Sequence, residues 1–425
     1  NGNWIVQRDT SGDIASKPPV QVWLASLASL PFGRAHWFTL AIPSVLGVTM
    51  TALVAAWFAA RVMPKDTRAP LFAGLLVAIS MMGAKQVALV RTDALLGGVV
   101  ALTAALAWGA SRGKTNWVFF WIAGAIGALT KGPVGPLVAS FGLVSRPWRT
   151  GEKQSKPILT HADGVALFIA ITGGWVLLAY LDAGQPFIDK VIGKELVGHA
   201  TASGKGDPPL VGFYKSPWYF LWFYAPASPL ALVCLFRMWK AADERTRAVV
   251  RFLGWWMLGG LALFSLSPHQ RADLLTPIWA PCGALAGCLV AHWVSEWSRR
   301  AVWGAVFAAM VLTFTAVHVH RHMVVADDKH IVRARMIEEL GERLRSYHSL
   351  DRLRAYNSHS YLEYVLGRMT IRLTDEQART WWLSKLPMTV NATWWENSER
   401  EPESVHVADS IEDGQFRIDV VHYRG

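Results

Sequence analysis

Long apolar runs separated by short polar segments fill the chain from residue 36 to about residue 320. A membrane-spanning helix needs about 20 predominantly apolar residues. Runs of about this length predict spanning helices at residues 36–62, 70–90, 93–111, 162–183, 216–239, 248–267, 271–294 and 303–320. The pattern is typical of a mainly helical, polytopic membrane protein.

One further apolar run, residues 116–145, is interrupted by Lys131-Gly132-Pro133. Because Gly and Pro disfavour a continuous helix, we expect two short helices that meet at a break here, which brings the expected number of passes to about ten. Lipid cannot satisfy the polar groups of irregular backbone, so protein or water must surround such a break.

The last hundred residues have a different pattern, typical of a soluble domain. An amphipathic helix is predicted at 329–347, and helical stretches near 358–367 and 374–386. Short strand-like runs fall at 352–357, 370–373, 388–393, 404–408 and 415–422. We therefore expect three regions, namely a juxtamembrane segment at 1–35, a transmembrane helical domain at 36–320 and a small α/β domain at 321–425.

The composition supports a membrane protein, since 52% of residues are hydrophobic and 17% are charged, whereas soluble proteins average about 25% charged residues. The net charge of +11 raises the question of nucleic-acid binding. Lys and Arg cluster in short loops between the apolar runs, however, which is a signal of membrane topology. We therefore expect the membrane as a partner and no nucleic acid.

The sidedness of the protein follows from the same cations. If the passes alternate, most Lys and Arg of the loops fall on one side, and the positive-inside rule places that side in the cytoplasm. The segment 1–35, the loop 184–215 and the domain 321–425 then lie outside the cytoplasm. Both ends of the chain share a side, as an even number of passes requires.

Ionisable residues gather towards the predicted outer ends of the helices, where each marks a candidate functional site. These residues are Lys17, Lys85, Arg91, Asp93, Lys131, His269, Arg271 and Asp273. Cations at this rim can hold an anionic lipid headgroup and stabilise a departing phosphate, and a carboxylate beside them can act as a general base. The alternative for a single cation, above all for Lys85, is snorkelling to the interface.

Several short motifs resemble, in consistent order, bacterial GT-C glycosyltransferases of the aminoarabinose transferase and protein O-mannosyltransferase family. The resemblance covers about residues 1–320. The motifs are Trp4-Ile5-Val6, Ser16-Lys17-Pro18-Pro19-Val20, Arg34 to Ser44, Arg91-Thr92-Asp93, Thr130-Lys131-Gly132-Pro133 and Ser267 to Pro277.

The resemblance implies a GT-C fold and an inverting transfer of a sugar from a polyprenyl-phosphate-linked donor. The acceptor would be lipid A, protein or another envelope molecule, at the outer face of the bacterial inner membrane. Asp93 would serve as a catalytic carboxylate. Lys17, Arg91, Lys131 and Arg271 would contact the lipid phosphate or line its cavity.

A divalent metal, Zn²⁺ or Mg²⁺, is a further possibility. Glu195 and His199 are four residues apart, which places both on one face of a helix, and both residue types are competent metal ligands. The alternative is that they are ordinary surface residues. No other cofactor is expected.

The sequence departs from the family pattern in three places. The principal catalytic Asp of the family lies after a first transmembrane helix, and we expect both features upstream of Asn1. Ser16 stands where the family often has an acidic residue. In the late motif the usual Lys and Tyr are replaced, and Arg271 could supply the phosphate contact instead.

Two other classes of function remain open. A transporter or lipid flippase would place its polar groups near the middle of the membrane, at paired broken helices, and the sequence predicts one break. A non-catalytic envelope scaffold would leave the rim of cations unexplained.

Overall fold

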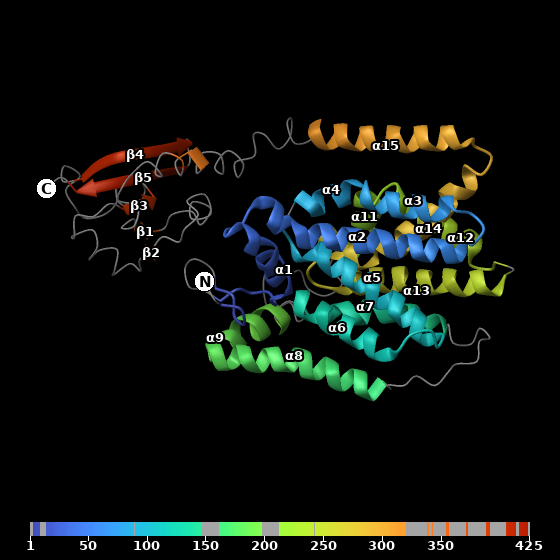
Figure 1. Cartoon of the computed structure of the whole chain (residues 1–425), viewed down its shortest axis with the longest axis horizontal. Helices are drawn as coiled ribbons and strands as arrows, with labels where there is room; N and C mark the ends of the chain where they lie inside the picture. The colour runs from blue at the N-terminus through green and yellow to red at the C-terminus, as the bar shows by residue number, and fades with distance from the viewer. Residues whose placement is uncertain are drawn as a thin grey trace. The chain divides into compact units, whose positions relative to one another are not determined.

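A computed structural model describes residues 3–8, 14–88, 90–146, 161–197, 212–241 and 243–319, followed by five strands and a few helical residues. The chain forms two compact units. The first comprises Asn1–Gln7 and Ile14–Phe314, and the second comprises Arg8–Asp13 and Thr315–Gly425. The first unit is a helical bundle, and the described strands of the second unit form a sheet (Figure 1).

The bundle contains helices of several lengths, including short 3-10 helices (η1, η2 and η5) and one π-helix (η4). In chain order they are α1 (Val20–Ser29), η1 (Leu30–Phe32), α2 (Trp37–Val62), α3 (Arg68–Ala78), α4 (Met81–Ala88), α5 (Thr92–Ser111), α6 (Trp117–Lys131), α7 (Val134–Ser140), η2 (Phe141–Ser145), α8 (His161–Ala183), α9 (Gln185–Phe187), η4 (Ile188–Val197), α11 (Lys215–Phe223), α12 (Ala227–Met238), α13 (Glu244–Leu266), η5 (Ala272–Ile278), α14 (Trp279–Trp293) and α15 (Arg299–Val319).

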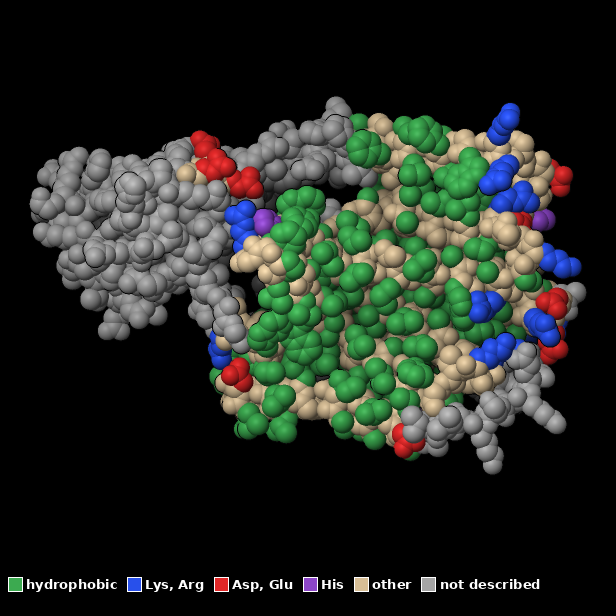
Figure 2. Space-filling view, in the orientation of Figure 1, with side chains coloured by type: hydrophobic (Ala, Val, Ile, Leu, Met, Phe, Trp, Pro, Cys, Tyr) green, Lys and Arg blue, Asp and Glu red, His purple; other side chains and the backbone are tan. Residues whose placement is uncertain are grey.

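The bundle is a multi-pass membrane structure, as predicted. Five helical segments of the described chain are long and apolar enough to cross a membrane, and the count rises to seven if two bent pairs each form one span. This is fewer than the predicted ten, because several apolar runs divide into shorter helices. On the face shown in Figure 2, hydrophobic side chains cover the side of the bundle, and most of the visible Lys and Arg lie at one end.

The predicted break after Lys131 is confirmed. Helix α6 ends there, and Gly132 has a φ of +101°, a conformation that favours glycine. Pro133 then precedes α7.

The structure adds two breaks inside runs that the sequence predicts as continuous helices. Helices α3 and α4 meet at 54°, where the Ser80 hydroxyl accepts a hydrogen bond from the backbone N–H of Gly83 at the start of α4. Helices α11 and α12 meet at 103° beside Pro226, which has no backbone N–H to continue a helix. The prediction of a single break was therefore wrong, and the number of breaks no longer argues against a transporter.

Small residues bring the central helices into backbone contact, as is common in membrane bundles. Helices α2 and α5 lie side by side (Figure 1). A Cβ atom added to Gly47 of α2 would lie 2.2 Å from the carbonyl oxygen of Ala94, and one added to Gly287 of α14 would lie 2.4 Å from the nitrogen of Ala73 in α3. The first contact fixes where α5 begins relative to α2, and the second holds α14 against α3.

The described part of the second unit contains strands β1 (Arg354–Tyr356), β2 (Ile371–Arg372), β3 (Met388–Asn391), β4 (Val405–Asp413) and β5 (Phe416–Tyr423). Their order is β2-β1-β3-β5-β4, with β1 parallel to both of its neighbours and β5 antiparallel to both of its own. Every strand overlaps a predicted strand-like run. The predicted helices at 358–367 and 374–386 lie outside the described residues, so the α/β character of this region stays a prediction.

Candidate functional site

Two buried carboxylates lie at the same end of the bundle. Asp93 is in the first turn of α5, Asp273 is in η5, and each residue is 5% exposed. The Thr276 hydroxyl donates a 2.8 Å hydrogen bond to the backbone carbonyl of Asp93. Gly97, one turn further along α5, packs against Thr276 so closely that an added Cβ would lie 3.0 Å from its carbonyl oxygen. Helix η5 is therefore held against the beginning of α5.

Asp93 pairs with Lys131. The Lys131 ammonium donates a hydrogen bond to Oδ1 of Asp93, and both side chains are largely buried. The carboxylate lies in the first turn of α5 and the ammonium in the last turn of α6, so each charge is at the favourable end of its helix dipole. The structure thus brings together two residues that the sequence singled out.

Asp273 is the centre of a larger cluster. Its Oδ1 accepts from the side-chain amide of Gln86 and contacts the ammonium of Lys85, both at 3.0 Å. Its Oδ2 accepts from Arg91 at 2.7 Å and from Arg271 at 3.4 Å. The predicted site residues Arg91 and Arg271 therefore meet on Asp273, a rim residue to which the sequence assigned no specific role.

The cluster carries an excess of positive charge. Three cations share one carboxylate, which leaves a net charge of +2. The Asp273 side chain is 7% exposed, whereas those of Lys85, Arg91 and Arg271 are 40%, 38% and 47% exposed. The carboxylate is thus buried, whereas the three cations that contact it are partly exposed.

The segment that carries Lys17 lies beside α6. Lys17 is half-buried just before α1. Val20 and Trp23 of α1 pack against a cluster that includes Leu129, in the last turn of α6. The Trp23 indole also donates a 2.7 Å hydrogen bond to the carbonyl of Trp4. Two sequence motifs are thereby joined at the end of α6 that bears Lys131.

The sequence did not indicate that Lys85 and Gln86 contact Asp273, or that Thr276 contacts the backbone of Asp93. The interpretation of Lys85 as a snorkelling cation is corrected by its contact with Asp273. The pair Arg271 and Asp273 could have indicated this cluster, since a carboxylate at the beginning of an apolar run requires a compensating positive charge. The identity of that charge depended on which helix faces η5.

The predicted metal ligands are not tested by the structure. Glu195 belongs to η4, but its side chain and all of His199 lie outside the described residues. Within the described segments, no group of three or more His, Cys, Asp and Glu side chains is placed to hold a metal ion.

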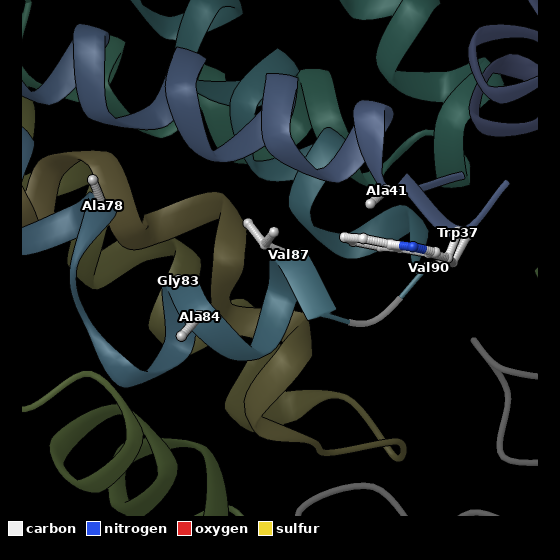
Figure 3. A pocket seen from close by; sticks show the side chains of 7 residues that line it. All are labelled: Trp37, Ala41, Ala78, Gly83, Ala84, Val87 and Val90. Atoms are coloured by element: carbon white, nitrogen blue, oxygen red, sulfur yellow. The ribbon is translucent and has the colours of Figure 1, made fainter. Parts of the chain in front are cut away.

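An apolar groove of about 380 Å³ lies along α4 (Figure 3). It is lined by Trp37, Ala41, Ala78, Gly83, Ala84, Val87 and Val90. Ala84 and Val87 flank Lys85 and Gln86 in the sequence, so one short helix contributes both to the groove and to the cluster. The groove and the Asp273 cluster therefore share the helix α4.

Comparison with known proteins matches both the sequence and the fold. Residues 16–175 match the family described as dolichyl-phosphate-mannose-protein mannosyltransferase. An undecaprenyl phosphate-alpha-4-amino-4-deoxy-L-arabinose arabinosyl transferase of Pseudomonas aeruginosa is 26% identical over 300 residues, which are 67% of this chain and 52% of the relative. The same enzyme of Enterobacter sp. is 26% identical over 343 residues, 74% of this chain and 58% of the relative. The chain spans about half the length of the curated relatives it matches.

Among solved structures, ArnT from Cupriavidus metallidurans bound to undecaprenyl phosphate matches with a TM-score of 0.69 at 16% identity, over 99% of this chain and 90% of that one. Its apo state matches equally well in fold, at 18% identity. The chain is therefore similar in sequence to curated aminoarabinose transferases and has the GT-C fold of ArnT, as its motifs predict.

Proposed function

We propose that this protein transfers a sugar from a polyprenyl-phosphate-linked donor to lipid A, protein or another envelope acceptor. The reaction would take place at the outer face of the bacterial inner membrane. The observation that carries the proposal is the convergence of Arg91, Asp93, Lys131 and Arg271 at one end of the bundle, through the contact between α5 and η5.

The charges of the site suit this chemistry. In the donor, a phosphodiester links the sugar to the lipid and carries one negative charge. When the bond between the sugar carbon and the phosphate oxygen breaks, the electron pair stays on that oxygen, and the departing monoester gains a second negative charge. Arg91 and Arg271 are placed to stabilise that charge, with Lys131 and Lys17 on the neighbouring elements.

The acceptor hydroxyl or amine attacks the sugar carbon and must lose a proton. Among the described residues, the Asp93 carboxylate has one hydrogen-bonding partner, Lys131, so it retains capacity to accept a further proton or hydrogen bond. Asp273 already receives contacts from four donors and lacks that capacity. We therefore assign proton transfer to the centre formed by Asp93.

We assign the apolar groove along α4 to the isoprenoid chain of the donor. The support is that α4 contributes residues both to the groove and to the Asp273 cluster, since an amphiphilic phosphate needs an apolar surface for its chain and cations for its headgroup. Gly83, Ala84 and Val87 would contact the chain while Lys85 remains near the phosphate.

Transport of a glycolipid is the second candidate, favoured by the two additional broken helices. Its weakness is the position of the charges. Asp93 lies in the first turn of α5, and the twenty residues of that helix separate it from Arg112 and Lys114 by about 30 Å. The polar groups therefore lie at one end of the bundle and not near the middle of the membrane.

One experiment separates the two candidates. The protein as its gene encodes it is reconstituted in liposomes with an undecaprenyl-phosphate donor that carries a radiolabelled aminoarabinose, and lipid A is added. Transfer predicts labelled lipid A and an equal amount of undecaprenyl phosphate. Movement of the intact donor across the bilayer without labelled lipid A would favour transport.

The position of residues 321–425 outside the cytoplasm is part of the proposal. It is supported by the excess of Lys and Arg in the loops at the end of the bundle opposite Asp93, because such loops face the cytoplasm. A cysteine introduced into 321–425 should react with a membrane-impermeant maleimide in intact spheroplasts. Reaction only after lysis would contradict this orientation.

A divalent metal at Glu195 and His199 also remains a proposal, based on ligand type and spacing. Glu195→Ala and His199→Ala should then lower the zinc content of the purified protein. Equal zinc content in both variants and the wild type would remove this assignment.

A further inference from the structure

The carboxylate of Asp273 is fully occupied. A carboxylate offers about four lone-pair positions, and four donors approach Asp273, two at each oxygen. These donors come from three separate parts of the chain, namely α4, the residue before α5 and the residue before η5. Asp273 is therefore the shared contact of Arg271, which is close to it in the sequence, and of three side chains from the distant segment 85–91.

We propose that Asp273 is a positioning residue that gathers Lys85, Arg91 and Arg271 into a binding site for a phosphate monoester dianion. Lys85 becomes a ligand contact that none of the family motifs indicates. The choice of ligand class rests on the proposed function, whereas the charge arrangement does not.

A positioning role follows from the mutual repulsion of the cations. Three positive charges within a few ångströms of one another disfavour a common position, and the buried carboxylate offsets that repulsion. Lys85 directs one of its three donors to Asp273, and each Arg directs one of its five. The remaining donors belong to side chains that are more than one third exposed, so a ligand can reach them.

The charge of the site indicates which phosphate it prefers. A phosphate monoester carries between about −1.5 and −2 charges at neutral pH, and a phosphodiester carries one. A site of net charge +2 therefore matches the monoester better. In the proposed reaction the donor is a diester and the released lipid is a monoester, so the cluster would stabilise the departing phosphate more than the bound donor.

The test is a binding measurement on the purified protein in lipid nanodiscs, with undecaprenyl monophosphate as the probe. Undecaprenol, which has no phosphate, and phosphatidylglycerol, which is a diester, serve as comparison lipids. The wild type should bind the monophosphate at least about tenfold more tightly than either, given the strength of charge-assisted hydrogen bonds.

Asp273→Asn gives the sharpest result, because two explanations predict opposite signs. The substitution raises the net charge of the cluster to +3, so simple attraction predicts tighter binding. Loss of positioning predicts binding weaker by about tenfold or more, because the cations separate. Lys85→Gln should weaken binding similarly, while Lys65→Gln, the same change at an exposed loop position, should leave it unchanged.

Asp273→Asn binding as tight as wild type or tighter would overturn the proposal, as would equal affinity of the wild type for monoester and diester. If Asp273→Asn does not fold, Gln86→Met serves in its place, since it removes one support of Asp273 without changing any charge. Gln86→Met should then weaken binding, and unchanged affinity would overturn the proposal.

The proposed function and the positioning role of Asp273 can be refuted independently of each other. A wild type that binds the monophosphate as described but transfers no sugar would refute glycosyl transfer alone. Normal transfer together with an unchanged inhibition constant for undecaprenyl phosphate in Asp273→Asn would refute the positioning role alone.

Discussion

Asp93 and Asp273 are equally buried, and their elements are joined by the hydrogen bond from Thr276, yet their surroundings differ. Among the described residues, Asp93 pairs with a single ammonium and forms a neutral pair. Asp273 is surrounded by three cations and an amide, and its cluster carries a net charge of +2. Burial alone therefore does not assign a role to a carboxylate. The number of donors around it decides whether it can still react.

The largest effect is expected for Asp93→Asn. The substitution removes the carboxylate assigned to proton transfer, so sugar transfer should fall by about two orders of magnitude. It also leaves the largely buried Lys131 without its counter-charge, and the protein should become less stable as well. Initial rates with labelled donor and the melting temperature measure the two consequences.

The double variant Asp93→Asn with Lys131→Met separates these consequences. Removing both charges should restore most of the lost stability, because no unpaired charge remains buried. It should not restore transfer. Recovery of activity in the double variant would show that Asp93 acts only through the ion pair, and the contrast with Asp273 would disappear.

Lys17→Ala is expected to lower transfer by about tenfold, through the loss of one phosphate contact. The variant also shows which centre Lys17 serves. Since α1 packs beside the last turn of α6, Lys17→Ala should couple energetically to Lys131→Met and add independently to Lys85→Ala. The opposite pattern in double-mutant cycles of kcat/KM would assign Lys17 to the Asp273 cluster.

Much of the site could be predicted from the sequence because charged residues in apolar runs are conspicuous. Arg91, Asp93, Lys131 and Arg271 were singled out in this way, and the structure brings them to one end of the bundle. The break after Lys131 was also predictable, because Gly132 and Pro133 each disfavour a continuous helix.

The remaining features depend on contacts that local pattern does not encode. The bend between α3 and α4 has neither Gly nor Pro at the break itself. The Ser80 hydroxyl accepts a hydrogen bond from the backbone N–H of Gly83 there. Gln86 and Asp273 are 187 residues apart, and nothing near either residue indicates that α4 faces η5. A cluster of donors around one carboxylate depends on how the helices pack in three dimensions. It cannot be inferred from the spacing of residues in the sequence.

Gly97→Ala probes the connection between the two centres. An added methyl group would lie 3.0 Å from the carbonyl oxygen and 3.1 Å from the Cβ of Thr276, so η5 must shift by a few tenths of an ångström. We expect a several-fold loss of kcat and a destabilisation of about 1–3 kcal/mol. Gly74→Ala is the matched control, because its nearest contact would be an ordinary 3.6 Å. Equal behaviour of the two variants would show that the spacing of the centres is not critical.

The smallest effect is expected at the other end of the bundle, where Asp243 caps α13. Its carboxylate accepts a 2.8 Å hydrogen bond from the backbone N–H of Thr246, and this bond, with the Thr246 hydroxyl, lowers the pKa of Asp243 below its usual value. A carboxyl group whose pKa is lowered by folding stabilises the protein above its unfolded pKa, and that contribution is lost as the pH falls through the folded pKa.

Asp243→Ala should therefore lower the melting temperature by about 1–2 °C at pH 7. The difference from wild type should begin to shrink below about pH 4, the usual pKa of an aspartate, and should be lost as the pH falls through the lowered folded pKa. Sugar transfer at pH 7 should be unchanged, because neither carboxylate centre is touched. A loss of transfer comparable to that of Gly97→Ala would mean that helix ends far from Asp93 and Asp273 also control the reaction. The roles assigned to the two carboxylate centres would then not fully account for sugar transfer.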